Sequence, residues 1–330
     1  MGSLAKGGRG IFVSEYYIIR RERMNKKVFI STTTFAEFDK APLKLLEEKG
    51  YQWSHNPHKR KMTSEEIFVS AKEAVGIVAG TETLGADVLK NLANLKVISR
   101  CGSGMDNVDI GAAEKKGIKV CNTPDGPTLA VAELTIGLIL NLLRRVNEMD
   151  TALRAGKWTK ITGNLLTGKK VGIVGFGRIG RKVANLLNAL GAEPMYYDVE
   201  EKKDVYKWCK KCDLDELLKE SDILSLHLSF SGKSNAFIGG KELKLMTPGS
   251  LLINVSRGGA VDEEALYDSL KKGHLAGAAL DVFKEEPYSG RLRELKNVIL
   301  TPHIGSYAKE ARVKMEVDAV KNLLVALGEK

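Results

Sequence analysis

Three side chains in the C-terminal half of the sequence could together move a proton and hold a carboxylate. Arg257, Glu286 and His303 each follow a short apolar run of the chain. Histidine titrates near neutrality, and a carboxylate on its second ring nitrogen would fix its tautomer and raise its pKa. The guanidinium fork of arginine matches a carboxylate bidentately. Each residue alone is better explained as a surface or capping side chain, but together they predict oxidation or reduction at a carbinol carbon.

A glycine motif further upstream predicts a dinucleotide-binding site. Residues 171–180 are VGIVGFGRIG, with G-x-G-x-x-G at Gly175, Gly177 and Gly180, between an apolar run and a helical segment. The first glycine would permit a tight turn, the second would let the backbone approach a pyrophosphate, and the third would let the helix pack on the strand. The helix N-terminus would add amide donors and a positive dipole end. A tight packing turn is the alternative explanation.

Asp198 provides a second test of this motif. It ends the next apolar run, 18 positions after Gly180. A carboxylate at that place accepts hydrogen bonds from the adenosine ribose hydroxyls and would repel a 2′-phosphate. A simple turn residue is the alternative. With strand, glycines, helix and acid in this order, the sequence predicts NAD in preference to NADP.

The elements that must position these residues alternate along the chain. From residue 24, short apolar runs are followed by helical periodicity, which is typical of βα units and parallel sheets. In a first set, we expect strands at 28–31, 74–79, 96–99 and 118–121 and helices at 42–49 and 86–92. Residues 122–127 (NTPDGP) then interrupt the pattern with two prolines and a glycine. The interruption predicts a boundary between two domains.

The second set begins after one long helix, expected at 128–153, and a polar connector at 158–166. Strands are expected at 171–175, 193–197, 223–227, 250–255, 276–280 and 298–300, and a last helix at 307–327. Six strands with intervening helices is the count for a doubly wound dinucleotide-binding domain. Because ligands bind outside the carboxyl ends of such strands, Arg257, Glu286 and His303 should lie at that edge.

Composition excludes several classes of protein. The length of 330 residues suits two domains, and 43% hydrophobic with 28% charged residues suit a globular protein. No apolar run approaches the roughly 18 residues that span a bilayer. The four cysteines are too few for a secreted disulfide scaffold, which predicts a cytoplasmic location. The net charge of +10 accompanies no nucleic-acid-binding motif, so we expect neither nucleic acid nor membrane as a partner.

Residues 1–23 do not match the pattern that follows them. They are Gly-rich at the start, and their charges mostly follow their apolar stretch, which is the wrong order for a secretory signal. We expect a disordered extension, explained by an expression remnant or a mis-assigned start. A transit peptide is the alternative.

Further motifs connect the chain to a known family. They are GSGMDNVD at 102–109, AVAEL at 130–134, NVSRGG at 254–259, LDVF at 280–283 with Glu286-Pro287, and TPHIG at 301–305. With the glycine motif, they resemble the D-isomer-specific 2-hydroxyacid dehydrogenases over residues 24–330, most closely the D-3-phosphoglycerate dehydrogenase-like members. The resemblance implies an α/β fold in which a Rossmann NAD-binding domain, 124–304, is inserted in a smaller flavodoxin-like α/β substrate domain, 24–123 and 305–330. It also implies a homodimer formed through the NAD-binding domains.

The resemblance also implies roles for individual residues. His303 resembles the acid/base of the family, Glu286 its partner carboxylate and Arg257 the clamp on the substrate carboxylate. Gly80 and Thr81 resemble the loop whose amides hold that carboxylate. The residues that resemble cofactor-binding positions are Ser103, Gly175, Gly177, Arg178, Ile179, Gly180, Asp198, Val255, Ser256, Asp281, His303 and Gly305, with Asp281 at the nicotinamide amide.

The activity implied is NAD-dependent oxidation or reduction of a small D-2-hydroxy or 2-keto acid (EC 1.1.1.-). Our first expectation is conversion of 3-phosphoglycerate to 3-phosphohydroxypyruvate, in serine biosynthesis. The alternative is a glyoxylate or hydroxypyruvate reductase, because residues 79–83 lack an arginine that would mark a phosphate site. A different class, the NAD-responsive corepressor scaffolds of the same fold, keeps the same residues. The chain departs from the family at Ser229, where proline is usual. We expect no regulatory domain of the kind appended to many phosphoglycerate dehydrogenases, and hence no feedback by serine through such a domain.

Other reactive-looking residues have simpler explanations. Cys209 and Cys212 form a C-x-x-C, but no second pair of ligands lies nearby, so we expect no metal site. His227 is expected to be a packed strand-end residue and His274 a surface residue. The basic stretch 55–61 could neutralise a substrate phosphate, although a solvated loop is the commoner explanation.

Overall fold

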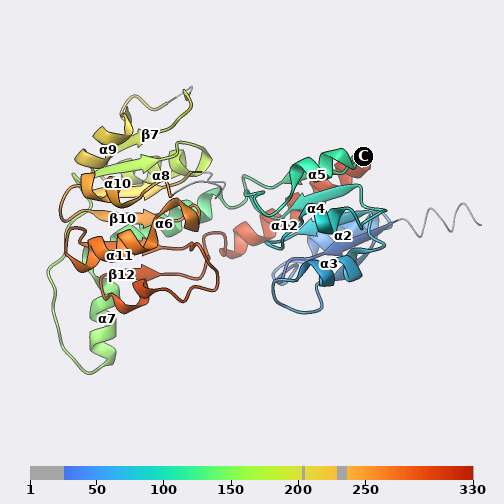
Figure 1. Ribbon diagram of the computed structural model, residues 1–330, viewed down its shortest axis with the longest axis horizontal. Helices are drawn as coiled ribbons and strands as arrows, with labels where there is room; N and C mark the ends of the chain where they lie inside the picture. Colours follow the sequence, from blue (N-terminus) through green and yellow to red (C-terminus); the bar gives the residue numbers. More distant parts are fainter. Residues whose placement is uncertain (1–25, 203–204, 229–235, 330) are drawn as a thin grey trace, which may run out of the picture. The chain divides into compact units, whose positions relative to one another are not determined.

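The computed structural model describes residues 26–202, 205–228 and 236–329, which form two compact units (Figure 1). Unit 1 contains the described residues up to Gly126 together with those from Lys309 onward, and unit 2 contains the described residues of Pro127–Ala308. Unit 2 is therefore inserted in the sequence of unit 1. The expected extension 1–23, Ser229 and the loop after it lie outside the described residues.

Unit 1 is built on a five-stranded parallel sheet with the strand order β2-β1-β3-β4-β5. The strands are β1 (Lys27–Ile30), β2 (Gln52–His55), β3 (Gly76–Ala79), β4 (Val97–Arg100) and β5 (Lys119–Asn122). This is the order of flavodoxin-like sheets, in which the direction of winding reverses between the first and third strands. The strand ends after β1 and β3 therefore define the ligand-facing position of this sheet.

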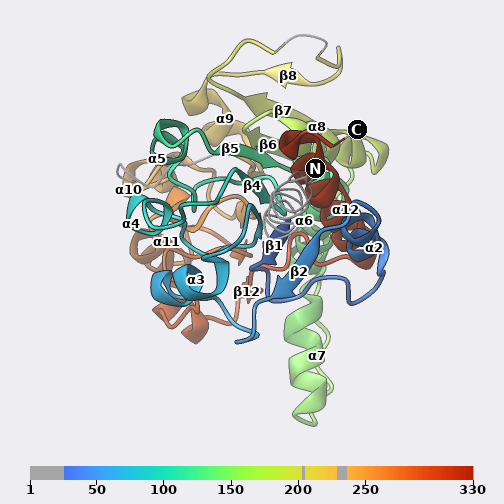
Figure 2. The same cartoon turned by 90° about the vertical axis from the view of Figure 1, so that its right-hand side faces the viewer.

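Helices cover both faces of this sheet, which is why its three inner strands, β1, β3 and β4, are mostly apolar. They are α2 (Ala41–Glu48), α3 (Ser64–Ala71), α4 (Ala86–Leu89), α5 (Ile110–Lys115) and α12 (Lys309–Leu327). Figure 2 shows α2 and α12 on one side and α3, α4 and α5 on the other. Val28 and Ile30 pack with Leu323 of α12, while Phe29 between them packs with Ile67 of α3.

Unit 2 contains a seven-stranded parallel sheet with the order β12-β11-β10-β9-β6-β7-β8. Its strands are β6 (Lys170–Val174), β7 (Glu193–Tyr197), β8 (Lys210–Lys211), β9 (Ile223–Leu226), β10 (Leu251–Asn254), β11 (Gly277–Leu280) and β12 (Val298–Leu300). Winding reverses between β6 and β9, as in Rossmann domains. The glycine motif directly follows β6, at this reversal.

The helices of unit 2 bury the two faces of its sheet in separate clusters. The helices that do so are α6 (Thr128–Arg144), α8 (Arg178–Ala189), α9 (Leu214–Glu220), α10 (Gly240–Leu245) and α11 (Glu263–Lys271), with 3-10 turns at Gly258–Ala260 and Arg291–Glu294. The remaining helix, α7 (Val146–Arg154), has no buried residue. One cluster joins Ile139 of α6 and Ala184 of α8 to the sheet, and the other joins Leu217 of α9 and Leu266 of α11 to it.

The prediction of one helix over 128–153 is wrong. Arg145 adopts a left-handed conformation, φ 52°, and separates α6 from α7. The Asn141 side chain stabilises the break, because its Oδ1 accepts the N–H of Asn147 at 2.9 Å. A break of one residue hardly disturbs the helical period, so the pattern did not reveal it.

Two strands and two helices were not predicted. β2 is an edge strand with exposed residues, and β8 consists of two exposed lysines, so neither has an apolar pattern. α3 begins at a capping box formed by Thr63 and Glu66, a sequence signal that the prediction did not use. α5 begins after Asp109, whose side chain accepts the Ala112 N–H. Within the described ranges, no helix is long and apolar enough to cross a membrane.

Candidate active site

His303 and Glu286 form a hydrogen-bonded pair in unit 2. The Nδ1 atom of His303 lies 2.9 Å from Oε2 of Glu286. The other carboxylate oxygen, Oε1, accepts the backbone N–H of Phe283 at 3.1 Å, which fixes the orientation of Glu286. When Nδ1 donates to the carboxylate, Nε2 is the nitrogen that can exchange a proton with a ligand. The arrangement is that of a general acid/base with a positioning carboxylate.

Asp281 holds the loop that carries His303. Its carboxylate accepts the Thr301 hydroxyl at 2.6 Å and the N–H groups of Ile304 and Gly305, each at 2.8 Å. Between these donors, His303 adopts a left-handed conformation, φ 55°. Burial raises the pKa of Asp281, although these hydrogen bonds and the charge of His303 oppose the rise. Asp281 is therefore a positioning residue of the histidine loop in this structure.

Arg257 lies in the turn after β10, and the neighbouring strand β11 leads to Glu286. Asn254 shapes this turn, because its Nδ2 donates to the carbonyl oxygen of Arg257 at 2.9 Å and its Oδ1 accepts the Ser256 hydroxyl at 2.8 Å. A Cβ atom at Gly258 would lie 1.8 Å from the carbonyl carbon of Phe283. The turns after β10 and β11 therefore pack directly on each other.

Strand register places the three predicted catalytic residues at one edge of the sheet of unit 2. Asn254 pairs with Leu280, and Leu280 pairs with Leu300, so β10, β11 and β12 end side by side. The predicted cofactor positions Val255 and Ser256 follow β10, and Gly305 follows β12.

The turn from β6 to α8 fits a dinucleotide pyrophosphate. Gly175 has φ 90°, and a Cβ atom there would lie 2.6 Å from the carbonyl oxygen of His227. A Cβ atom at Gly180 would lie 2.1 Å from the carbonyl oxygen of Gly175, so the helix packs tightly on the turn. At Gly177, by contrast, a Cβ atom would meet nothing within 4 Å. No side chain caps the start of α8, and the N-terminus of a helix is suited to bind phosphate oxygens.

Asp198 lies beside this turn and is paired with a lysine that the sequence analysis did not consider. Its Oδ2 accepts the Phe176 N–H at 2.7 Å, its Oδ1 accepts the Glu200 N–H at 2.9 Å, and the Lys202 Nζ is 3.4 Å from Oδ1. Burial opposes ionisation, but these groups together lower the pKa of Asp198 below its ordinary value. The carboxylate is thus ionised and partly neutralised.

The predicted substrate loop belongs to unit 1. Gly80 directly follows β3, and its N–H is already engaged by Oε2 of Glu82 at 3.0 Å and by the Ser31 hydroxyl oxygen at 3.2 Å. Ser103 follows β4, and its carbonyl oxygen accepts the Asn122 Nδ2 at 2.7 Å. Sequence reasoning missed Glu82, although an acid two residues after a strand-ending glycine was a visible signal.

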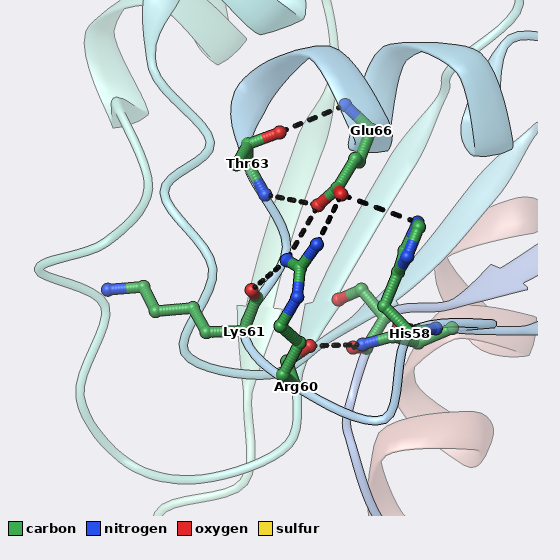
Figure 3. A network of polar contacts seen from close by, with 7 residues as sticks. His58, Arg60, Lys61, Thr63 and Glu66 are labelled. Atoms are coloured by element: carbon green, nitrogen blue, oxygen red, sulfur yellow. Dashed lines mark hydrogen bonds and ion pairs between the residues drawn. The ribbon is translucent and has the colours of Figure 1, made fainter.

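The basic stretch 55–61 is largely occupied by its own contacts (Figure 3). Arg60 donates to both carboxylate oxygens of Glu66, at 2.9 and 2.6 Å. Glu66 also accepts the Thr63 N–H at 2.9 Å at the start of α3. The Arg60 hydrogen bonds and the backbone hydrogen bond from Thr63 lower the pKa of Glu66 to about 2. Lys59 and Lys61 remain exposed on the surface.

The remaining reactive residues are packed inside unit 2. His227 is half-buried, its Nε2 is 2.8 Å from the Ser225 hydroxyl, and desolvation of the ring lowers its pKa to about 3. Cys209 and Cys212 are free, buried thiols in different core clusters, and burial raises the pKa of Cys209 to about 12. His274 is half-buried, with Nε2 3.0 Å from the Leu243 carbonyl oxygen. In the parts of the chain that the structure describes, no cluster of His, Cys, Asp or Glu is suited to hold a metal ion.

Comparison with known proteins assigns this arrangement to a family. Residues 136–305 match the family model described as D-isomer specific 2-hydroxyacid dehydrogenase, NAD binding domain. The chain is 44% identical to a glyoxylate reductase of Thermococcus litoralis, over 76% of this chain and 79% of the relative. It is 36% identical to a hydroxypyruvate reductase of Thermotoga maritima, over 86% and 96%. It is 39% identical to a D-3-phosphoglycerate dehydrogenase of Methanocaldococcus jannaschii, over 76% of this chain but 49% of that longer relative.

A solved structure agrees with these relatives. The TT0316 protein of Thermus thermophilus is 35% identical, has a TM-score of 0.84, and is matched over 92% of this chain and 98% of that chain. The predicted α/β fold, with an NAD-binding domain inserted in a substrate domain, is confirmed. The chain belongs to the D-isomer-specific 2-hydroxyacid dehydrogenases, NAD-dependent enzymes that act on the CH–OH group of a 2-hydroxy acid.

Proposed function

We propose that this enzyme reduces a small unphosphorylated 2-keto acid, glyoxylate or hydroxypyruvate, with NADH. We therefore prefer glyoxylate and hydroxypyruvate as substrates to 3-phosphoglycerate, our first expectation. The relatives named glyoxylate reductase and hydroxypyruvate reductase align along most of their length, whereas the phosphoglycerate dehydrogenase aligns along half. Arg60, the arginine of the basic stretch, is paired with Glu66 and is not an open phosphate site. Glyoxylate and hydroxypyruvate need no phosphate site.

The pairing of His303 with Glu286 is the observation that carries the proposed chemistry. A protonated His303 donates its Nε2 proton to the oxygen of the keto group as that oxygen becomes a hydroxyl. Glu286 stabilises the imidazolium and keeps the ring in one orientation, and Arg257 binds the substrate carboxylate. The nicotinamide, when bound, supplies the hydride. Thr81 presents a backbone N–H as a further carboxylate donor in this proposal.

The proposed cofactor contacts follow the predicted positions. The start of α8, with Arg178 and Ile179, binds the pyrophosphate, and Asp198 accepts the hydroxyls of the adenosine ribose. The other proposed contacts to the cofactor are Ser103, Val255, Ser256, Asp281 and Gly305. In Asp281, the carboxylate oxygens that would meet the nicotinamide amide also hold the histidine loop.

The decisive experiment measures NADH oxidation by the purified chain. The substrates are glyoxylate, hydroxypyruvate, phosphohydroxypyruvate and pyruvate, with NADPH in parallel. We expect kcat/KM to be highest for glyoxylate or hydroxypyruvate. A preference for phosphohydroxypyruvate would restore our first expectation, and tight NADH binding without turnover of any acid would favour the scaffold function.

We also propose that the enzyme is a cytoplasmic homodimer. The four free thiols support a reducing compartment. No residue of α7 is buried, and Leu153 is 54% exposed and Trp158, just beyond the helix, 80% exposed. In Figures 1 and 2, α7 extends away from the sheet of unit 2. A second copy that covers this arm would bury these apolar side chains. Light scattering should give the mass of a dimer, and Trp158→Ser should weaken it.

A further inference from the structure

The strand order of unit 1 defines where a ligand can approach its sheet. In a sheet of this order, ligands bind outside the carboxyl ends of the strands at the reversal of winding, here β1 and β3. Ser31 directly follows β1, and Gly80 directly follows β3. The contacts of these two residues therefore decide what the edge can bind.

The buried side chain of Glu82 occupies the hydrogen-bond donors at the ends of β1 and β3. Its side chain is only 1% exposed. Its Oε2 accepts the Gly80 N–H at 3.0 Å and the Ser31 hydroxyl at 2.8 Å, and its own backbone N–H also bonds to the carboxylate. Asn107 locks the segment, because its Nδ2 donates to the carbonyl oxygens of Gly80 at 3.1 Å and Glu82 at 2.6 Å. The carboxylate is therefore a fixed part of the loop 80–83.

The loop leaves a ligand little to bind besides one amide. A Cβ atom at Gly80 would lie 2.8 Å from Oε2 of Glu82 and 3.1 Å from Cα of Thr32, so the carboxylate presses against the backbone. Thr81 is exposed, and its N–H makes no hydrogen bond within the described residues. The loop therefore offers a ligand the Thr81 amide, next to Gly80, whose own N–H is bonded to the Glu82 carboxylate.

The charge of the ligand then decides how well it is tolerated. Burial raises the pKa of Glu82, while hydrogen bonds and the charge of Arg100 at the end of β4 lower it. Glyoxylate and hydroxypyruvate each carry one negative charge, and a phosphate group adds about 1.5 to 2 more. Repulsion from a carboxylate in a partly buried site grows in proportion to the charge of the ligand.

We propose that Glu82 is a specificity-determining positioning residue. Its carboxylate accepts the hydrogen bonds of the Gly80 N–H and the Ser31 hydroxyl, where the winding of the unit 1 sheet reverses, and it places a negative charge there. The enzyme accordingly accepts singly charged 2-keto acids and rejects phosphorylated ones. This inference rests on the proposed function and adds a physical basis for its substrate class.

The test compares selectivity, defined as kcat/KM for glyoxylate divided by kcat/KM for phosphohydroxypyruvate, in three variants. Glu82→Gln keeps the shape and an acceptor oxygen but removes the charge. We expect its selectivity to fall at least about tenfold, mainly through a lower KM for phosphohydroxypyruvate. Glu82→Asp keeps the charge and should retain selectivity within about twofold, whatever its effect on the loop. The matched control Glu65→Gln, at an exposed glutamate of α3, should leave both substrates unchanged.

The outcomes separate a charge effect from a structural one. If Glu82→Gln binds NADH normally but keeps the wild-type selectivity, the inference is wrong. If Glu82→Gln fails to fold, Glu82→Asp decides, because a large loss of selectivity with the charge retained would also overturn it. The proposed function is judged separately, from the preference of the wild-type enzyme, whereas the role of Glu82 is judged from the change between variant and wild type.

Discussion

The two sheets of this enzyme reverse their winding in the same way, but they treat the backbone amides at the reversal differently. In unit 2, Gly177 precedes α8 without a side-chain cap, and a Cβ atom at Gly177 would meet nothing within 4 Å. In unit 1, the Gly80 N–H is already bonded to Glu82 and Ser31. The reversal in unit 2 can therefore offer amide donors to a bound anion, whereas in unit 1 the amide of Gly80 is already bonded to the carboxylate of Glu82.

This difference shows that topology specifies where a ligand can bind but not which ligand. A parallel sheet always directs the turns after its strands to one edge. At that edge, uncapped amides at a helix N-terminus attract phosphates, because nothing else satisfies them. A single buried carboxylate reverses the preference, because it satisfies the amides and adds a negative charge. Variants at either edge can break this contrast, and the largest effect is expected at His303, the proposed acid/base.

A change of His303 should greatly slow the reduction of the keto acid. His303→Asn removes the proton donor while keeping a polar side chain that tolerates the left-handed backbone, φ 55°. We expect kcat to fall about 10²- to 10⁴-fold. The dissociation constant for NADH, measured by fluorescence, should change little. Near-normal turnover in this variant would show that another group transfers the proton.

A pair of glycine variants should affect different ligands in the two units. Gly175→Ala introduces a side chain at φ 90° and 2.6 Å from the His227 carbonyl oxygen, so NADH binding should weaken about tenfold or more. Gly80→Ala places a Cβ atom 2.8 Å from Glu82 Oε2, so the KM for the keto acid should rise while NADH binding stays normal. If both variants changed the dissociation constant of NADH, or both changed the KM for the keto acid, the contrast between the two edges would be wrong.

A smaller effect is expected at the ribose position of unit 2. The negative charge of Asp198 disfavours the 2′-phosphate of NADPH. The ammonium of Lys202, 3.4 Å from Asp198 Oδ1, partly offsets this charge. Lys202→Gln should therefore weaken NADPH binding about tenfold and change NADH binding less than about twofold. Fluorescence titration of both cofactors measures this directly, with Lys219→Gln on α9 as the control. Equal weakening for both cofactors would mean that Lys202 acts only through local structure.

The sequence predicted the site of unit 2 better than that of unit 1 for a physical reason. Arg257 and Glu286 follow apolar strands that are buried on both sides, and His303 follows the apolar, partly buried edge strand β12. Their positions at one edge could therefore be inferred from local pattern. The left-handed backbone of His303 depends on donors aimed at Asp281, which no local pattern records. Tertiary contacts likewise position the Glu82 carboxylate, because its partner Ser31 follows another strand.

Two of the four edge strands show the same limit. β2 and β8 pair with buried neighbours but expose their own side chains, so they have no apolar signal. The break at Arg145 depends on a side-chain cap from Asn141 rather than on a helix-breaking residue. Pattern reasoning therefore recovers strands with apolar residues and misses those that are fixed by pairing alone.

The smallest expected effect concerns Arg60, in the basic stretch after β2 at the same edge of unit 1. Because its guanidinium is bonded to both oxygens of Glu66, Arg60→Gln should leave the KM for phosphohydroxypyruvate within about twofold of wild type and cause only a small fall in melting temperature.

The pKa of Glu66 is lowered from 4.5 to about 2, so the pair stabilises the fold above pH 4.5 and loses this effect as the pH falls through about 2. The difference in melting temperature between Arg60→Gln and wild type should therefore be present at pH 7 and disappear near pH 2. Lys61→Gln, which removes an exposed cation from the same stretch, is the control. A severalfold rise in the KM for phosphohydroxypyruvate in either variant would show that this edge attracts phosphate after all, and the contrast with unit 2 would lose its basis.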